Sequence, residues 1–322
     1  MALDFTRGEA KQWALESIKG FYMCPISPVN DQFEIDEPAL RQNIEAFIEM
    51  GVNGLVVGGF ISEGWNLTPS KWLRYHQVVA DVAKGRIPLW TIILDPCVHT
   101  ALEKLDAVEK MGFEGAEVIN PVVQLRTDDE IFDWFKYLTD RTDLAICLYR
   151  TPVSGKVMGF DLMKRLSDLE TCIAVKQGSL VRAETLKLRR LIRDDFIVSD
   201  PSEAVFLEEL RIGGQVVWGE LSYILYGKKR HIVDEYRALA AKGEWEQARV
   251  VSDQLNPIRL MLEDLMLWKI AETATYAGTI AGVKGWFEAI GLNGGNIIPP
   301  LKTVSQAEKD ALKGTLQDLG VC

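Results

Sequence analysis

The sequence is poor in the residues from which metal centres are built. Its 322 residues include only three histidines, and His76, His99 and His231 all fall in helical or pre-helical segments. A catalytic metal would need a cluster of His, Asp or Glu ligands at strand ends. We therefore expect surface or capping histidines and no metal site.

Cysteine is also scarce, with five residues and no Cys-x-x-Cys spacing. Cys24, Cys147 and Cys172 lie inside apolar runs, where a thiol usually acts as a small hydrophobic side chain. Neither Cys147 nor Cys172 has a histidine on its strand to activate it, so we do not expect a nucleophilic cysteine. A chain of this length buries enough surface to fold without disulfides.

Two further absences exclude membrane and nucleic-acid partners. No run of about 18 uninterrupted apolar residues occurs, and the start, MALDFTRGEAKQW, lacks an apolar signal core. The 36 basic and 46 acidic residues give a net charge of −10, without the positive footprint that non-specific nucleic-acid binding requires. The basic run at 228–230 is read as a solvated helix face. We expect a soluble, cytoplasmic protein.

What is present is a regular alternation of short β-branched runs and longer helical patterns. The runs predict strands near 20–27, 52–59, 87–94, 115–120, 144–150, 172–177, 195–199 and 215–220. Helices are predicted between them, near 37–50, 69–84, 98–111, 128–140, 161–168, 181–192 and 202–212. Potential N-caps precede several helices and glycines follow them: Asp36, Thr68, Thr100, Thr127, then Gly51, Gly85 and Gly112.

Strands separated by helices predict right-handed βαβ units and a parallel sheet. A doubly wound open sheet would carry a glycine-rich phosphate loop after its first strand, and PISPVN at 25–30 does not resemble one. We therefore predict an α/β fold of the (β/α)8 TIM-barrel type at 20–242, after an N-terminal segment at 1–19. A C-terminal helical extension at 243–322 follows, with helices near 244–266, 273–290 and 305–318 after one at 228–242.

Alternation along two strands identifies candidate catalytic residues. In 144–150 and 172–177 the small residues share one face with Tyr149 and Lys176, and we expect this face to point into the barrel. Both residues then lie at the carboxyl ends of their strands, where barrel active sites form. A buried lysine loses part of its preference for the charged form, and its neutral amine attacks carbonyl groups. The alternative is a lysine that reaches solvent at the barrel mouth with its stem on apolar neighbours.

The sequence resembles the dihydrodipicolinate synthase and N-acetylneuraminate lyase superfamily. Tyr149-Arg150-Thr151-Pro152 is similar to its tyrosine-x-x-proline segment, and Ile173-Ala174-Val175-Lys176 to its Schiff-base lysine strand. The resemblance extends to GVNGLVVGGFISEGWNLT at 51–68 and FIVSDPSEAVFLEELRIGG at 196–214. It implies that Lys176 forms an imine with pyruvate or another 2-oxo acid, without an external cofactor or metal, and that Tyr149 relays protons. It also implies a homo-oligomer, commonly a tetramer.

The same resemblance assigns the carboxylate of the 2-oxo acid to the loop after the second strand. Gly59, Phe60 and Ile61 match this loop, whose backbone N–H groups still provide donors. Family members usually carry two hydroxyl residues where Phe60 and Ile61 stand, and Ser62 is a candidate to restore one. Glu63 is expected to brace the loop.

Other departures argue against dihydrodipicolinate synthase itself. The arginine that holds the carboxylate of its aldehyde substrate aligns with Ser154, with Arg150 beside the tyrosine instead. Its partner-subunit tyrosine falls near Val122 or Val123. We expect an apolar mouth, formed by Phe60, Ile61, Trp65, Val122, Val123 and Trp218, with Glu220 as a possible substrate contact.

An apolar mouth favours an aromatic or otherwise apolar aldehyde, as in the hydratase-aldolases of the superfamily. The predicted function is a Schiff-base lyase or aldolase that converts a substituted 2-oxo acid to pyruvate and an aldehyde, or the reverse. Two alternatives stay open: a 2-keto-3-deoxy sugar-acid dehydratase of the same superfamily, and a barrel that binds a 2-oxo acid without catalysis. Core or interface packing is the competing explanation for Trp65 and Trp218.

Overall fold

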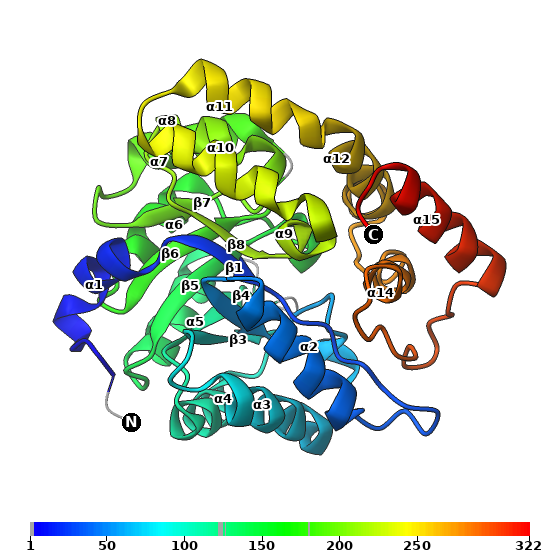
Figure 1. Ribbon diagram of the computed structural model, residues 1–322. Helices are drawn as coiled ribbons and strands as arrows, with labels where there is room; N and C mark the ends of the chain where they lie inside the picture. The colour runs from blue at the N-terminus through cyan, green and yellow to red at the C-terminus, as the bar shows by residue number, and fades with distance from the viewer. Residues whose placement is uncertain (1–2, 122–124, 126, 180) are drawn as a thin grey trace.

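Eight parallel strands form a nearly closed barrel, so the predicted (β/α)8 TIM barrel is confirmed (Figure 1). The structure is a computed structural model, and it describes residues 3–121, 125, 127–179 and 181–322. The strands pair in the order β7-β6-β5-β4-β3-β2-β1-β8, and the Ser199 hydroxyl donates to the Val216 carbonyl, at 2.8 Å, across the remaining seam. Their bounds are β1 (Gly20–Met23), β2 (Gly54–Val57), β3 (Leu89–Ile93), β4 (Gly115–Ile119), β5 (Ala145–Arg150), β6 (Cys172–Gln177), β7 (Ile197–Ser199) and β8 (Val216–Glu220).

Helices follow the strands around the barrel close to their predicted positions. They are α2 (Glu37–Glu49), α3 (Pro69–Ala83), α4 (Val98–Met111), α5 (Asp128–Thr139), α6 (Phe160–Ser167), α7 (Arg182–Leu191), α8 (Phe206–Arg211), α9 (Ser222–Leu225) and α10 (His231–Ala241). The side chains of Asp36, Thr68 and Thr127 cap α2, α3 and α5 as predicted. Thr100 does not cap α4, because this helix already begins at Val98.

The N-terminal segment contains a helix that the sequence did not predict, α1 (Ala10–Ser17). It packs beside β6, and Lys11 donates to the Leu169 carbonyl at 2.6 Å. Trp13 stacks on Trp90 of β3 with ring centroids 6.4 Å apart. This helix therefore covers one end of the barrel, and the strand ends that carry Tyr149 and Lys176 point away from it.

The C-terminal extension is more broken than predicted. It comprises α11 (Trp245–Ser252), a 3-10 turn (Asp253–Leu255), α12 (Asn256–Leu262), a π turn (Glu263–Leu267), α13 (Trp268–Thr273), α14 (Ile280–Ala289) and α15 (Gln306–Asp318). The helix predicted at 273–290 begins only at Ile280, since Ala274 adopts a left-handed conformation with φ of 52°. In Figure 1, α11 and α12 extend along one side of the molecule, and α14 and α15 lie together beyond them.

One of the histidine predictions is wrong. His76 is buried in α3, with Nδ1 2.8 Å from the Trp72 carbonyl and Nε2 2.9 Å from the Thr91 hydroxyl. Burial lowers the pKa of His76 to about 3, so this ring is a neutral core residue. His99 and His231 are exposed, as expected.

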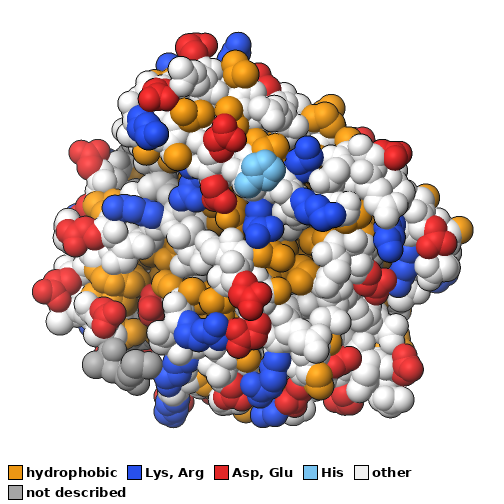
Figure 2. Space-filling view, viewed as in Figure 1, with side chains coloured by type: hydrophobic (Ala, Val, Ile, Leu, Met, Phe, Trp, Pro, Cys, Tyr) orange, Lys and Arg blue, Asp and Glu red, His pale blue; other side chains and the backbone are white. Residues whose placement is uncertain are grey.

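The surface is mixed in character. Figure 2 shows acidic, basic and apolar side chains interspersed over the face in view. Within the described part of the chain, no helix is long and apolar enough to cross a bilayer. The same residues contain no group of three side chains suited to hold a metal ion.

Candidate active site

Tyr149 and Lys176 are direct neighbours in the barrel wall. The register of β5 and β6 pairs them, and both side chains are buried. Lys176 Nζ lies 4.3 Å from the centre of the Tyr149 ring. Both line the same cavity, on the side of the strands that the alternation of small residues predicts.

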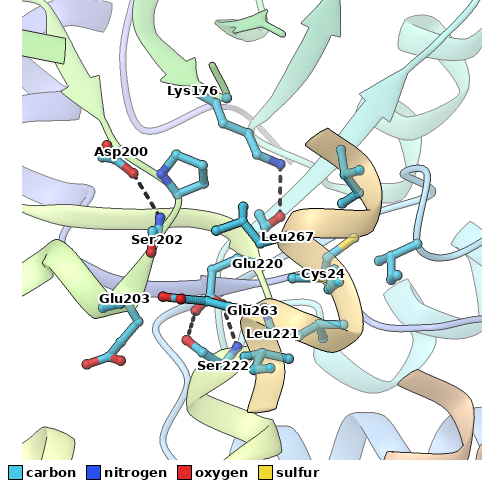
Figure 3. A pocket seen from close by; sticks show the side chains of 18 of the residues that line it. Cys24, Lys176, Asp200, Ser202, Glu203, Glu220, Leu221, Ser222, Glu263 and Leu267 are labelled. Carbon is cyan, nitrogen blue, oxygen red and sulfur yellow. Dashed lines mark hydrogen bonds between the residues drawn. The ribbon is translucent and has the colours of Figure 1, made fainter. Parts of the chain in front are cut away.

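This cavity, of about 380 Å³, lies between the carboxyl ends of the strands and the C-terminal extension. Figure 3 shows the Lys176 amine entering it, with Glu220 and Ser222 below and the helix that carries Glu263 and Leu267 beside it. The extension contributes an apolar wall made of Leu262, Met266, Leu267, Trp268 and Ile270, together with the charged side chains of Arg259 and Glu263. The end of β8 and the segments that follow β6, β7 and β8 contribute polar groups: Ser179, Arg182, Asp200, Ser202, Glu220 and Ser222.

The Lys176 amine has two partners in the barrel. It donates to the Gly219 carbonyl at 2.9 Å and to Oε1 of Glu117 at 3.3 Å. Burial is the largest single influence and acts to lower the pKa of Lys176. Glu117, through its charge and its hydrogen bond, together with Tyr276 and Cys24 outweighs burial, so the pKa is raised. The sequence argument, which included burial alone, was therefore wrong about the direction, and the resting lysine is an ammonium ion paired with a carboxylate.

Glu117 is a site residue that the sequence analysis missed. It lies on β4, its side chain is inaccessible to solvent, and its Oε2 has no hydrogen-bond partner among the described residues. Burial raises the pKa of its carboxyl group. A glutamate in the apolar strand GAEVI is a detectable signal, because long charged side chains are rarely buried without a task.

Tyr276 is the second missed residue. It lies in the irregular segment between α13 and α14, and its hydroxyl is 2.7 Å from that of Tyr149. Its ring stacks on Phe60 with centroids 5.2 Å apart and planes inclined by 6°. Burial raises the pKa of both phenols, so both are protonated at neutral pH. The extension thus places a second hydroxyl beside Tyr149.

The loop after β2 presents apolar side chains to the cavity. Phe60 and Ile61 line it, whereas Gly59 packs against Ile92 and Cys24 and does not. The Ser62 hydroxyl lies 3.5 Å from Sγ of Cys24, and Ser62 does not line the cavity. Its role as a hydroxyl donor to the carboxylate site stays a prediction.

Glu63 joins this loop to the C-terminal extension. It is buried in a left-handed conformation with φ of 55°. One oxygen is 2.6 Å from Lys284 Nζ of α14, and the other accepts the Ile298 N–H at 2.9 Å. Each carboxylate oxygen of Glu63 thus has a partner in the C-terminal extension, as expected for a residue that holds the loop in place rather than contacts substrate.

Of the remaining residues predicted at the mouth, neither tryptophan lines the cavity. Trp218 is buried between Tyr22 and Trp90, with centroids 4.9 and 4.7 Å away, and does not line the cavity. Trp65 is 44% exposed outside it, and Val122 and Val123 lie outside the described residues.

Two further residues complete the comparison with the sequence analysis. Glu220 lines the cavity and accepts hydrogen bonds from the backbone N–H of Leu221 at 2.7 Å and from the Ser222 hydroxyl at 2.5 Å. Burial raises the pKa of Glu220 to about 7. Arg150 points away from the cavity, with Nη1 2.6 Å from Glu184 and Nε donating to the Met158 carbonyl.

Comparison with known proteins agrees with this geometry. The sequence profile of the dihydrodipicolinate synthetase family matches residues 17–319. The 4-hydroxy-tetrahydrodipicolinate synthase 1 of Halalkalibacterium halodurans is 25% identical over 289 residues, which cover 89% of this chain and 92% of that protein. The corresponding synthase of Methanosphaera stadtmanae is 24% identical over 311 residues, covering 94% and 98%.

Solved structures share the fold. The 4-hydroxy-tetrahydrodipicolinate synthase of Methylacidiphilum fumariolicum SolV superposes with a TM-score of 0.80 at 23% identity, covering 94% of this chain and 96% of the other. The dihydrodipicolinate synthase of Thermotoga maritima does so with a TM-score of 0.81 at 22% identity, covering 95% and 100%. With a profile match across nearly its whole length, this chain belongs to the dihydrodipicolinate synthetase family.

Proposed function

We propose that the protein is a Schiff-base lyase or aldolase that joins or separates pyruvate and an aldehyde. The observation that carries this proposal is the pairing of Lys176 and Tyr149 in one cavity at the carboxyl ends of the strands. A pure binding module has no chemical need for an amine and a phenol side by side. The family assignment supports lysine-imine chemistry without fixing the substrate.

In the cleavage direction, the Lys176 amine adds to the 2-oxo carbon and water leaves, giving a protonated imine. Tyr149 takes the proton from the hydroxyl group of the substrate as the carbon–carbon bond breaks, while its own phenolic proton passes to the water released on imine formation, and the imine takes up the electron pair as an enamine. Protonation of the enamine and hydrolysis then release pyruvate. The hydrogen bond between Tyr149 and Tyr276 extends this proton relay by one hydroxyl group.

The carboxylate of the 2-oxo acid is assigned to the loop after β2. The structure records no hydrogen bond from the backbone N–H groups of Phe60 and Ile61 to any described residue, which leaves both available. Backbone donors of this kind stabilise an anion without side-chain hydroxyls.

The aldehyde is assigned to the space beside the extension. The apolar wall from Leu262 to Ile270 favours an aromatic or otherwise apolar substituent. Neither Arg150 nor Ser154 is placed to hold a carboxylate there: Arg150 pairs with Glu184, and the Ser154 hydroxyl donates to backbone carbonyls. Arg182 and Arg259 line the cavity, but they pair with Glu209 and Glu203, at 3.4 and 2.8 Å. This supports an aldehyde other than that of dihydrodipicolinate synthase.

One observation favours the dehydratase alternative. The polar side of the cavity, with Ser202, Ser222 and Glu220, suits a substrate with several hydroxyl groups. The products distinguish the two reactions, since a dehydratase retains the carbon chain and an aldolase yields pyruvate.

The test is the mass of the intact protein after incubation with pyruvate and borohydride, with Lys176→Ala as the control. We expect a pyruvate-sized increase in the native protein and none in the variant. No increase with pyruvate or any member of a broader 2-oxo acid set would contradict the proposal and leave the non-catalytic barrel. Turnover by a folded Lys176→Ala protein would contradict the mechanism.

A further inference from the structure

Glu117 occupies a position beneath the reactive amine, on the side away from the mouth. The register of β4 and β5 pairs Glu117 with Cys147, whereas Tyr149, two residues further toward the mouth, pairs with Lys176. The Lys176 side chain therefore extends away from the mouth, toward the barrel interior, where its Nζ lies 3.3 Å from Glu117 Oε1. A substrate that enters from the mouth meets the other side of the amine.

The surroundings of Glu117 offer few partners for a permanently buried charge: burial raises its pKa and outweighs Lys176 and, more weakly, the Trp218 indole, which act to lower it. Its side chain is fully buried, and only Lys176 is recorded as an ion-pair partner among the described residues. Oε2 has no hydrogen-bond partner within the described part of the chain. Burying a carboxylate with one of its oxygens unpartnered is costly, and well-packed apolar residues in place of such a pair are often as stable or more so. This arrangement calls for a functional explanation.

The backbone at Gly219 lies directly against the ion pair of Glu117 and Lys176. A Cβ atom on Gly219 would lie 2.8 Å from both Glu117 Oε2 and Lys176 Nζ, and Gly219 has a φ of 63°. A side chain at position 219 would separate the two charges or strain the strand end. Glycine at this position thus permits both the Gly219 carbonyl contact and the approach of Nζ to Glu117.

We propose that Glu117 is the proton acceptor that frees the Lys176 amine and then the counter-ion of the protonated imine. This inference rests on the Schiff-base function proposed above. A proton passes from the ammonium group to Glu117, and the nitrogen lone pair forms the bond to the 2-oxo carbon. The carbonyl oxygen then leaves as water, carrying this proton and a second one from the nitrogen. The C=N bond forms with a positive charge on nitrogen, opposite a Glu117 carboxylate that is ionised again.

The counter-ion has a specific consequence for catalysis. An imine accepts electrons from the breaking bond only while its nitrogen is protonated, and a dry cavity disfavours that positive charge. A fixed carboxylate at contact distance keeps the nitrogen protonated without solvent. Glu117 touches the reacting nitrogen and is therefore a catalytic residue under this proposal.

The test is the pH dependence of imine formation in Glu117→Gln, measured as pyruvate incorporation under cyanoborohydride. Glutamine keeps the shape and can still accept a hydrogen bond from Nζ, but it lacks the charge. The largest influence that raises the pKa of Lys176 is then gone and burial remains, so the pH of half-maximal incorporation should fall by at least about one unit. Turnover should fall by about 100-fold or more, within the range of a positioned acid or base.

Two variants make the result specific. Glu117→Asp keeps the charge at a greater distance, and its pH profile should lie between those of the native protein and Glu117→Gln. This variant carries the same test if Glu117→Gln does not fold. Glu114→Gln is the matched control, because Glu114 immediately precedes β4 at its opposite end and does not line the cavity. Its profile and turnover should match those of the native protein.

The outcomes separate this inference from the function on which it depends. If native protein traps pyruvate at Lys176 and the Glu117 variants have unchanged pH profiles, the role of Glu117 is wrong and the Schiff-base function stands. If the native protein traps no 2-oxo acid, the proposed function fails and the inference fails with it. A downward shift confined to the Glu117 variants supports both.

Discussion

At the scale of residues, the cavity combines four groups whose chemistry depends on one another. The Lys176 amine contacts the Glu117 carboxylate and lies over the ring of Tyr149. The hydroxyl of Tyr149 in turn contacts the hydroxyl of Tyr276. Proton transfer from either phenol depends on the charge of the lysine or imine, since all four groups share a poorly hydrated space. A substitution at one of them should therefore alter the pH response of the others.

Tyr276→Phe tests the second phenol directly. The variant keeps the ring that stacks on Phe60 and removes only the hydroxyl that contacts Tyr149. We expect turnover to fall by about 10- to 1000-fold, toward the lower part of the acid–base range because Tyr149 remains. The measurement is kcat and KM for the cleavage or condensation reaction.

Two further variants bracket this prediction. Tyr149→Phe should lower turnover by about 10²–10⁴-fold. The double variant with Tyr276→Phe should have only slightly lower turnover than Tyr149→Phe if both phenols serve one proton path. Tyr137→Phe is the control, because Tyr137 is 37% exposed and does not line the cavity. Full activity of Tyr276→Phe would show that its hydroxyl serves packing alone.

Sequence analysis found one half of this group and missed the other. Tyr149 and Lys176 were found because strand alternation assigns a face and the residues lie at strand ends. Glu117 lay in a segment predicted as a strand, but no pattern in the sequence indicates which lysine a buried carboxylate will contact. Tyr276 was hidden because the helical pattern at 273–290 continues through it, while Ala274 and the residues after it leave the helix.

At the scale of elements, a buried ion pair connects the loop after β2 to the C-terminal extension, in addition to the buried pair of Arg259 and Glu203, 2.8 Å apart, which joins the extension to the segment after β7. Lys284 of α14 contacts Glu63 at 2.6 Å and donates to the carbonyls of Ser27 and Asn296 at 3.0 and 2.5 Å. These bonds hold the loop that begins with Phe60, where the carboxylate of the substrate is assigned. α14 therefore supports a binding loop that lies more than 200 residues earlier in the chain.

Lys284→Met should weaken both stability and substrate binding. Removing one partner leaves Glu63 as an uncompensated buried charge, at a cost of about 3–5 kcal/mol in the free energy of unfolding. The loop then loses its support, so KM for the 2-oxo acid should rise more than kcat falls. Urea unfolding and steady-state kinetics measure the two effects.

A double variant and a surface control complete the test. Lys284→Met with Glu63→Gln should recover part of the stability, because the buried charge is gone while the Ile298 N–H keeps an acceptor. Lys309→Met removes the surface contact of Lys309 to Glu288 and should cost about 1 kcal/mol or less. Equal costs for Lys284→Met and Lys309→Met would contradict a special role for the buried pair.

The elements themselves were largely predictable. Caps such as Asp36 and Thr127, with glycine at positive φ after the helices, give local signals that tertiary contacts do not override. The π turn Glu263–Leu267 has no such signal, because its residues EDLML continue a helical pattern. Its position over the cavity is consistent with the frequent occurrence of π turns at functional sites.

At the scale of the whole molecule, the cavity belongs to two parts of the chain with different tasks. The barrel supplies Lys176, Tyr149 and Glu117, and the extension supplies Tyr276 and the apolar wall. The second phenol thus comes from the same chain, and no contribution from a partner subunit is needed to place it. The homotetramer and the chain divisions at 20–242 and 243–322 stay predictions.

This division of tasks predicts that the extension sets aldehyde preference without affecting imine formation. Met266→Ala should lower kcat/KM for the condensation of pyruvate with benzaldehyde by about tenfold. Loss of apolar contacts in a hydrophobic pocket weakens transition-state binding by about 1–3 kcal/mol. The same variant should trap pyruvate at Lys176 as fast as the native protein does. Condensation with glyceraldehyde, which has no apolar ring, should change little.

Leu260→Ala is the matched control for Met266→Ala. Leu260 lies on α12, is 62% exposed and does not line the cavity, so neither aldehyde should respond. A loss with Met266→Ala that is equal for benzaldehyde and glyceraldehyde would mean that the wall only closes the cavity. A loss confined to glyceraldehyde would favour the hydroxylated substrates of a dehydratase. Selective loss with benzaldehyde would assign recognition of the aldehyde to the extension and imine chemistry to the barrel.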